Sequence, residues 1–180
     1  MDRQEHIKVH ETPRLTLRPF DIADAESFYR NFTGEEENLQ FFTDIRYDLE
    51  RTKALITDWS DARGGEEHWR WAATLKGGQD VIGIVSLRLV DPSDRIGELS
   101  FGIGNTFWGR GLGSELVQAV LDICASERNF AEVIAAFDKE NFRAIRTARR
   151  CGMRYRGEMV ESRSKDSVCF VVYTLCFPED

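Results

Sequence analysis

The feature that most constrains how this chain can fold is the glycine-rich segment at residues 103–115, where the sequence reads IGNTFWGRGLGSE. A strand pattern covers residues 96–103, before the glycines. After them, apolar residues recur every three or four positions up to about residue 128, as in an amphipathic helix. Three alternating glycines let the main chain turn tightly between the two and come close to a ligand without interference from a Cβ. The segment therefore predicts a strand, a tight turn and a helix in direct succession.

Such a turn is suited to binding phosphate. The first N–H groups of a helix have no intrahelical acceptor, and the helix dipole favours an anion. Several N–H groups converging on a diphosphate could each contribute about 1.5–3 kcal/mol as charge-assisted hydrogen bonds. The sequence lacks the G-x-x-x-x-G-K-[ST] of a P-loop, and Ser114 or Leu116 stands where a dinucleotide-binding G-x-G-x-x-G needs glycine. A glycine turn that binds no ligand is the alternative.

The remaining patterns indicate a mixed α+β fold. In chain order they predict a strand at 14–20, helices at 22–32 and 48–62, strands at 69–75, 81–90 and 96–103, a helix at 112–128, a strand at 131–137, a helix at 142–151, and strands at 153–160 and 168–177. The strand–helix–strand unit in the middle should be a right-handed parallel crossover, and the other strands should pair antiparallel. We therefore expect a mostly antiparallel, twisted sheet of about seven strands with four helices, in a single domain spanning residues 1–180.

The composition argues against several classes of protein. A formal net charge of −7 makes nucleic-acid binding improbable and is compatible with a cationic or amine substrate. The four cysteines form no C-x-x-C pair and lie far from the three histidines, so we expect no metal site and a reducing, cytoplasmic environment. We also expect no signal peptide and no membrane span, because the sequence has no run of about 18 apolar residues.

Four segments in order resemble the GNAT superfamily of acetyltransferases. W-G-R-G-L-G at 108–113 is similar to its coenzyme A signature [Q/R]-x-x-G-x-[G/A], with Trp108 in the first position, as is usual in the branch of ribosomal-protein N-terminal acetyltransferases. R-L-T-L-R at 14–18 matches the opening strand of that branch, and E-L-S-F-G-I at 98–103 resembles its E-[IL]-G-Y-W-[IL]. E-N-F-R-A and R-C-G-M within 140–153 resemble its E-N-x-x-S and K-x-G-F.

The resemblance covers the chain from residue 13 to about 176 and implies the GNAT fold, with acetyl-CoA as co-substrate and no metal. It implies that the pantetheine arm lies along Phe101, Gly102 and Ile103. The diphosphate would lie on the turn formed by Trp108, Gly109, Arg110, Gly111, Leu112, Gly113 and Ser114. Asn141 matches the family asparagine that bonds the coenzyme arm, and it could also cap the helix that follows.

Two carboxylates are candidates for the base that accepts the proton of the amine. Glu98 matches the family's strand glutamate, and Asp138 ends the following strand; the alternatives are a paired strand carboxylate and a turn cap, respectively. Glu158 and Glu161 are weaker candidates. An α-amine with a pKa of about 7.7–8.0 is roughly 10–15% neutral at pH 7, whereas a lysine amine with a pKa of about 10.4 is only about 0.04% neutral. An α-amine therefore needs less help from a base.

The positions of the general acid depart from the family pattern. Ala148 stands where many members have a tyrosine, and Ala144 replaces the serine of the branch. We expect the acceptor pocket to involve the first two helices and residues 38–48, including Phe41, Phe42 and Tyr47, although ordinary core packing would also explain these aromatic residues.

The expected activity is transfer of an acetyl group to the α-amine of a protein or peptide, by direct attack in a ternary complex. The alternatives are a small-amine acetyltransferase, acting on a polyamine, an amino acid or an aminoglycoside, and a coenzyme A-binding module without catalysis. The expected partners are acetyl-CoA and the amine acceptor, and the expected state is a monomer or a homodimer.

Overall fold

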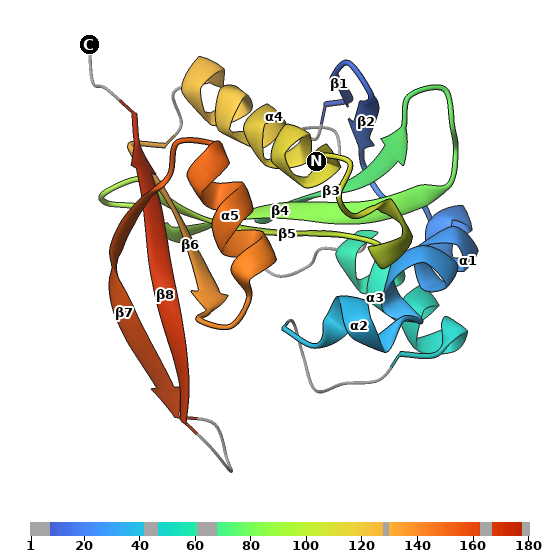
Figure 1. Cartoon of the computed structure of the whole chain (residues 1–180). Coiled ribbons are helices and arrows are strands. Elements are labelled where there is room, and N and C mark those ends of the chain that lie inside the picture. The colour runs from blue at the N-terminus through green and yellow to red at the C-terminus, as the bar shows by residue number, and fades with distance from the viewer. Residues whose placement is uncertain (1–7, 42–46, 61–67, 128–129, 163–166, 178–180) are drawn as a thin grey trace.

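The computed structural model describes residues 8–41, 47–60, 68–127, 130–162 and 167–177 (Figure 1). The strands are β1 (His10–Glu11), β2 (Leu15–Arg18), β3 (His68–Leu75), β4 (Val81–Asp91), β5 (Ile96–Ile103), β6 (Glu132–Asp138), β7 (Arg154–Ser162) and β8 (Ser167–Cys176). The α-helices are α1 (Ala25–Phe28), α2 (Glu36–Leu39), α3 (Leu49–Ser60), α4 (Leu112–Glu127) and α5 (Phe142–Arg150). The strands form one sheet in the order β1-β2-β3-β4-β5-β6-β8-β7.

The predicted fold class is confirmed. Every neighbouring pair of strands in the described sheet is antiparallel except β5 and β6, which are parallel and joined through α4. The helices α4 and α5 lie over one face of the sheet, while α1, α2 and α3 lie together on the other side (Figure 1). Alternation along β3 serves both layers, because Trp71 and Ala73 belong to the core under α4 whereas Ala72 belongs to the core under α1 and α3.

The structure has, in the residues that it describes, one strand and one helix more than the expected counts of about seven strands and four helices. The described residues form eight strands, and the additional one, β1, is a two-residue pairing with β2 that is too short to produce a hydrophobic period. They also form five α-helices, because α2, which follows soon after the first helix, has only four residues and was not expected.

The single helix expected at 22–32 is divided into three segments. It begins as a 3₁₀ turn, Ile22–Asp24, because Asp21 accepts from Ala23 N–H and Asp24 reaches back to Asp21 N–H in a capping box. It continues as α1 and ends as a π-helical turn, Tyr29–Thr33. The N–H of Gly34 closes that turn on Tyr29 O at 2.8 Å, and a Cβ on Gly34 would lie only 2.7 Å from the same oxygen. Glycine is therefore required at this bend.

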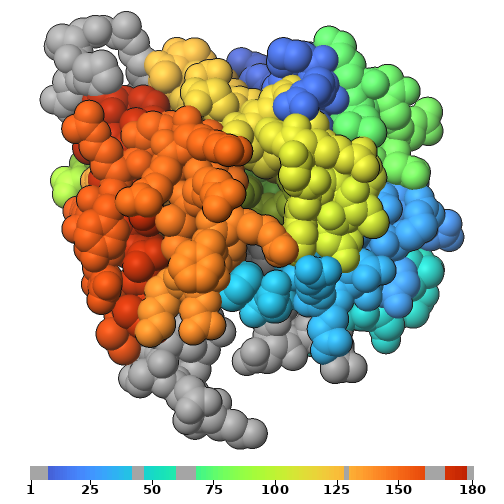
Figure 2. All heavy atoms as spheres, in the orientation of Figure 1, coloured from blue at the N-terminus to red at the C-terminus, as the bar shows by residue number. Residues whose placement is uncertain are grey.

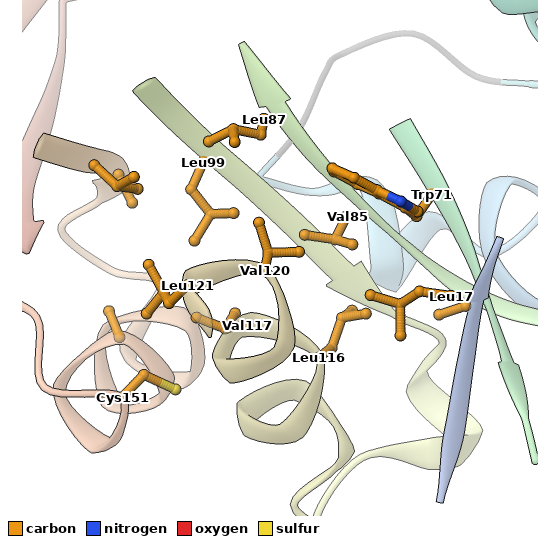
Figure 3. Close-up of a cluster of buried hydrophobic side chains, with 14 of the residues drawn as sticks. Leu17, Trp71, Val85, Leu87, Leu99, Leu116, Val117, Val120, Leu121 and Cys151 are labelled. Atoms are coloured by element: carbon orange, nitrogen blue, oxygen red, sulfur yellow. The ribbon is translucent and has the colours of Figure 1, made fainter. Parts of the chain in front are cut away.

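The larger core lies between α4 and the sheet (Figure 3). Leu116, Val117, Val120 and Leu121 of α4 are almost fully buried against the strands, where their contacts include Trp71. Each such side chain contributes about 1.5–3 kcal/mol through removal from water. This packing holds the N-terminal end of α4 against the end of β5.

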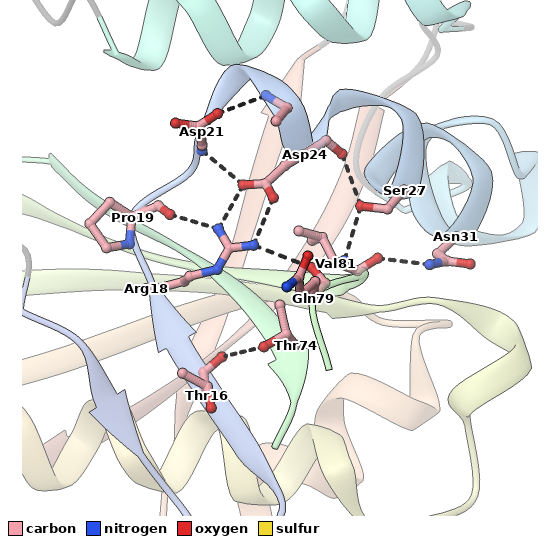
Figure 4. Close-up of polar contacts among 11 residues, drawn as sticks. Thr16, Arg18, Pro19, Asp21, Asp24, Ser27, Asn31, Thr74, Gln79 and Val81 are labelled. Atoms are coloured by element: carbon pink, nitrogen blue, oxygen red, sulfur yellow. Dashed lines mark hydrogen bonds and ion pairs between the residues drawn. The ribbon is translucent and has the colours of Figure 1, made fainter. Parts of the chain in front are cut away.

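The second layer is fixed to the sheet by a bidentate ion pair (Figure 4). The guanidinium of Arg18, at the end of β2, donates to both oxygens of the buried Asp24 carboxylate at 2.7 Å. Ser27 Oγ donates to Asp24 O and accepts from Val81 N–H, so the same turn is also bonded to β4. These contacts set the position of α1 and the π-helical turn relative to the sheet.

We expect Asp24→Asn to lower the free energy of unfolding by about 2–4 kcal/mol, because it leaves the half-buried Arg18 cation without its partner. Urea unfolding measures the change. Asp80→Asn is the matched control, since Arg30 and Asp80 form an ion pair of the same 2.7 Å length with both side chains largely exposed. The Asp80→Asn control should lower the free energy of unfolding by only about 0–1 kcal/mol. Equal costs for the two variants would contradict the assigned role of Arg18 and Asp24.

A second prediction concerns His68, which faces Arg88 across β3 and β4. Burial, followed by the charges of Arg70 and Arg88, lowers the pKa of His68 from 6.5 to about 4. Between these pH values the unfolded chain binds a proton that the folded chain does not, so stability decreases as the pH falls from 6.5 towards 4. We expect His68→Gln to remove about 1–2 kcal/mol of that decrease, a figure reduced for partial exposure of the ring. Urea unfolding of both proteins at pH 7.5 and 4.5 checks this, and identical pH dependence would contradict it.

Candidate functional site

The site lies where the one parallel strand pair of the described sheet separates. β5 and β6 pair over only three positions, Ile96–Glu98 opposite Glu132–Ile134. β4 continues beside β5 as far as Ile103, and β8 continues beside β6 as far as Asp138. Beyond Glu98 each strand therefore has a neighbour on its outer side, while no described strand lies between them. The sheet opens at its centre.

A cavity of about 460 Å³ lies at this opening. Its walls come from the end of β5, the glycine turn, one side of α5, and α2 with the residues after it. Figure 2 shows this face hollowed between the yellow, orange and blue segments. Of the residues expected to bind the coenzyme, those lining the cavity are Phe101, Gly102, Ile103, Trp108, Gly109, Gly111, Leu112, Gly113, Ser114 and Asn141. Arg110 does not line it, because its guanidinium donates to Thr106 O at 3.1 Å outside the cavity lining.

The glycine turn presents main-chain N–H groups without acceptors. Gly109 and Gly111 have φ angles of 75° and 76°, in the left-handed region that favours glycine. Among the described residues, none accepts a hydrogen bond from the N–H groups of residues 109–114; the first helical bond runs from Glu115 N–H to Gly111 O at 3.2 Å. These N–H groups lie at the N-terminus of a sixteen-residue helix. The arrangement, called the nest below, is suited to a diphosphate.

Residues between β1 and β2 support the glycine turn through hydrogen bonds to Glu115 and Arg110. Glu115 Oε1 accepts from Thr12 Oγ1 at 2.5 Å and from Arg14 N–H at 2.8 Å, while Glu115 Oε2 accepts from Arg14 Nε at 2.6 Å. Arg14 also donates to Arg110 O at 2.8 Å, inside the turn itself. Burial opposes the charge on Glu115, but the hydrogen bonds from Thr12 and Arg14 lower its pKa overall. The carboxylate therefore stays ionised and anchors the nest at neutral pH.

The Trp108 side chain is bonded to the end of β5 and is also in contact with α5. Its indole Nε1 donates to Ile103 O at 2.6 Å, which closes the chain between the end of β5 and the glycines. The guanidinium of Arg143, at the start of α5, lies 3.8 Å from the centre of the indole ring. This cation–π contact connects the glycine turn with α5 across the cavity.

Asn141 has the capping role that the sequence left open. Its Oδ1 accepts from Ala144 N–H at 3.1 Å at the N-terminus of α5, and the residue also lines the cavity. Ala144 lines the cavity as well, whereas Ala148 is fully buried. Neither position carries a side chain that could donate a proton.

Both candidate bases lie outside the residues that line the cavity. Glu98 belongs to the last paired position before the strands separate, and its Oε2 accepts from Arg88 Nη2 at 2.6 Å. Its Oε1 has no hydrogen-bond partner among the described residues. Asp138 ends β6, where its carboxylate accepts from Glu140 N–H at 2.8 Å and so caps a turn. Glu158 lies on the edge strand β7, and the side chain of Glu161 is outside the described ones.

The wall opposite α5 contains residues that the sequence did not single out. The Asn38 amide is buried and donates to the carbonyls of Asn31 and Phe32, in the π-helical turn, at 3.2 and 3.1 Å. Its Oδ1 accepts from Asn105 N–H at 2.8 Å, which fixes α2 to the segment after β5. Glu37, beside it, is the one carboxylate among the described residues that line the cavity. Asn38 falls in the range expected for the acceptor pocket, whereas Glu37 was not expected there, because α2 has only four residues and carries no clear period.

The aromatic residues expected in the acceptor pocket are divided between two places. Phe41 lines the cavity, as does Phe32. Tyr47 packs instead against the core under α1 and α3, and Phe42 falls outside the described residues. Trp69 and Trp71 share one face of β3, as alternation predicts, and both pack against the core under α4.

Within the part of the chain that the structure describes, no group of three or more His, Cys, Asp or Glu side chains is placed to bind a metal ion. No described helix is both long enough and apolar enough to span a bilayer.

Comparison with known proteins connects this geometry to a family. The family model for the acetyltransferase (GNAT) domain matches residues 14–154. The uncharacterised N-acetyltransferase p20 of Bacillus licheniformis is 26% identical over 139 residues, which cover 75% of this chain and 76% of that protein. The structure of RimL, a ribosomal L7/L12 alpha-N-protein acetyltransferase, in complex with coenzyme A has a TM-score of 0.80 at 16% identity and covers 94% of this chain and 98% of its own.

A second solved structure resembles this one to the same degree. The microcin C7 self-immunity acetyltransferase MccE, in complex with acetyl-CoA and AMP, has a TM-score of 0.81 at 15% identity, with 92% of this chain and 94% of that chain covered. At such identities the two structures show a shared fold. Together with the family match over most of the chain, they establish that this protein is an acyltransferase of the GNAT acetyltransferase family.

Proposed function

We propose that the protein transfers the acetyl group of acetyl-CoA to the α-amine of a protein or peptide N-terminus, in the cytoplasm. The observation that carries the proposal is the nest, whose unpaired N–H groups line a cavity at the opening between β5 and β6. Residues at this position match the coenzyme signature, and the RimL name supports an N-terminal acceptor. Four free cysteines are consistent with a reducing compartment.

We assign the donor site to the part of the cavity lining that runs from the glycine turn to the end of β5. The diphosphate would lie on the N–H groups of residues 109–114, and the arm would run along Phe101–Ile103 towards the opening of the sheet. Asn141, at the N-terminus of α5, would contribute its free side-chain N–H₂ group from the other wall. Apolar residues dominate the strand end, which suits the aliphatic part of the arm.

The chemistry requires proton transfer as well as positioning. The amine nitrogen forms a bond to the acetyl carbon, the carbon–sulfur bond breaks, the amine loses a proton, and the leaving thiolate gains one. We assign Glu98 as the proton acceptor, acting through water, because its free oxygen lies at the last paired position before the sheet opens. Asp138 is the second candidate. Since Ala144 and Ala148 cannot donate a proton, water is the proposed proton source for the thiolate.

The acceptor would approach from the wall formed by α2 and the residues after it. Glu37, the one carboxylate among the described lining residues, would attract a cationic amine, and Phe32 and Phe41 provide apolar contact beside it. A small amine would fit the same charges. A thiol-release assay with N-terminal peptides, polyamines and amino acids separates the two acceptor classes, and turnover of small amines alone would reject the peptide assignment.

Gly111→Val tests the nest. A β-branched side chain at a φ of 76° is strained, and it would displace the N–H groups that we assign to the diphosphate. We expect the acetyl-CoA dissociation constant, measured by calorimetry, to rise at least tenfold, since each charge-assisted hydrogen bond contributes about 1.5–3 kcal/mol.

Gly77→Val is the matched control for this variant. Gly77 has a φ of 78° in the turn between β3 and β4 and does not line the cavity. Both variants should lose about 1–3 kcal/mol of stability, but only Gly111→Val should lose affinity. Unchanged binding of acetyl-CoA by a folded Gly111→Val protein would remove the proposed donor site.

Glu98→Gln tests the proton acceptor. We expect kcat at pH 7 to fall by about tenfold to a hundredfold, at the low end of general-base effects because an α-amine is already partly neutral. The loss should become smaller above about pH 8, where the free amine predominates. Steady-state kinetics from pH 6.5 to 9 measure both effects.

Arg88→Gln distinguishes catalysis from ion pairing. It removes the same 2.6 Å contact but keeps the carboxylate. Most activity should therefore remain in Arg88→Gln and be lost in Glu98→Gln. Equal losses, independent of pH, would show that Glu98 has only a structural role.

A further inference from the structure

Positive charge is concentrated on one wall of the cavity. Arg143, Arg146 and Arg150 are spaced by three and four residues along α5, so they share one side of the helix, and all three line the cavity. The chain as a whole has a net charge of −7. The chain has no general excess of basic residues that would explain this local group of cations. The group therefore suggests an anionic ligand.

Two of these arginines are available to such a ligand. Arg143 is already in contact with the Trp108 ring. Arg146 and Arg150 are exposed, and neither forms a hydrogen bond or an ion pair with any residue of the described ranges. Glu37, the lining carboxylate, lies on the opposite wall, where it accepts from Asn105 Nδ2 at 3.2 Å. The two cations therefore have no protein counter-charge on their own wall of the cavity, among the described residues.

The packing of α5 places this pair beside the nest. A Cβ on Gly113 would lie 3.9 Å from Thr147 Oγ1, one residue after Arg146. Cys151 Sγ donates to Ser114 O at 3.3 Å, one residue after Arg150. Both arginines therefore lie on the turns of α5 that cover the first turn of α4. An anion held by them would be close to a diphosphate on the nest without competing for its N–H groups.

We infer that Arg146 and Arg150 bind the 3′-phosphate of the coenzyme's adenosine. The inference rests on the proposed function, because coenzyme A carries a phosphate monoester on its ribose in addition to the diphosphate. Neutral N–H groups of the nest satisfy the diphosphate oxygens. The monoester is separated from the diphosphate by the ribose and carries close to two charges at neutral pH, so it requires its own cations; planar guanidinium groups match its oxygens. The protein thus distinguishes coenzyme A from its 3′-dephospho form.

Calorimetric titration with acetyl-CoA and with acetyl-3′-dephospho-CoA tests the inference directly. The wild-type protein should bind acetyl-CoA about fivefold to thirtyfold more tightly, as expected for two exposed charge pairs. The preference should decrease between 50 and 500 mM salt. In the double variant Arg146→Gln, Arg150→Gln the preference should disappear, while affinity for the dephospho form stays at the wild-type value.

Arg149→Gln is the matched control, since this exposed arginine of the same helix does not line the cavity and should keep the full preference. Equal wild-type affinities for the two ligands would overturn the inference and leave the proposed function intact. A preference that persists in the folded double variant would also overturn it. Failure of the wild type to bind either ligand would reject the proposed function itself. Should the double variant not fold, Arg150→Gln alone should still reduce the preference, and an unchanged preference would contradict the inference.

Discussion

Strand β5 is held along its whole length by β4, but β6 stays beside it for only three residue pairs. The cavity depends on this loss of pairing, because a parallel partner beyond Glu98 would occupy the edge of β5 that now borders the opening. The separation is stable because neither strand lacks support: β6 is bonded to β8 through Asp138, and α4 packs its buried face under β5. Beyond this pairing, the main-chain groups on the facing edges of β5 and β6 border the opening, where a ligand can reach them.

The two walls of the cavity differ in charge and in how they are fixed. On the side of α5, arginines line the cavity, and Arg143 connects that helix to the glycine turn through Trp108. On the side of α2, the buried Asn38 amide bonds to carbonyls of the π-helical turn and to the segment after β5. Those two carbonyls, of Asn31 and Phe32, lie in the last turn of the first helix. The π-helical turn at the end of the first helix therefore helps to form the wall of the cavity that we assign to the acceptor.

Sequence reasoning located the long elements well. The bounds of β5 and α5 were placed to within a residue, since each element carries a clear period. It did not find β1, α2 or the division of the first helix, because these depend on contacts with distant parts of the chain. Asn38 of α2, for example, accepts a hydrogen bond from the N–H of Asn105, 67 positions away.

Most of the residues predicted to bind the coenzyme line the cavity, whereas neither predicted catalytic carboxylate does. The glycines of the nest stand at a fixed spacing in the sequence, so the motif predicted the part of the lining that the turn supplies. Arg110 lies outside the lining because its backbone, not its side chain, forms the turn. Glu37 and the arginines of α5 could not be assigned, since their proximity to the cavity depends on the packing of α2 and α5 around the opening of the sheet.

The contact between Arg14 and Glu115 joins residues 101 positions apart. The glycine motif is thus necessary but not sufficient for the geometry of the turn. Thr12 and Arg14, which lie between β1 and β2 at one edge of the sheet, complete it by hydrogen-bonding to Glu115 and to Arg110 O. A peptide containing only the strand, the turn and the first turns of α4 would lack that support. Formation of the site is therefore tied to assembly of the sheet from β2 to β5, and contacts of such large sequence separation slow folding.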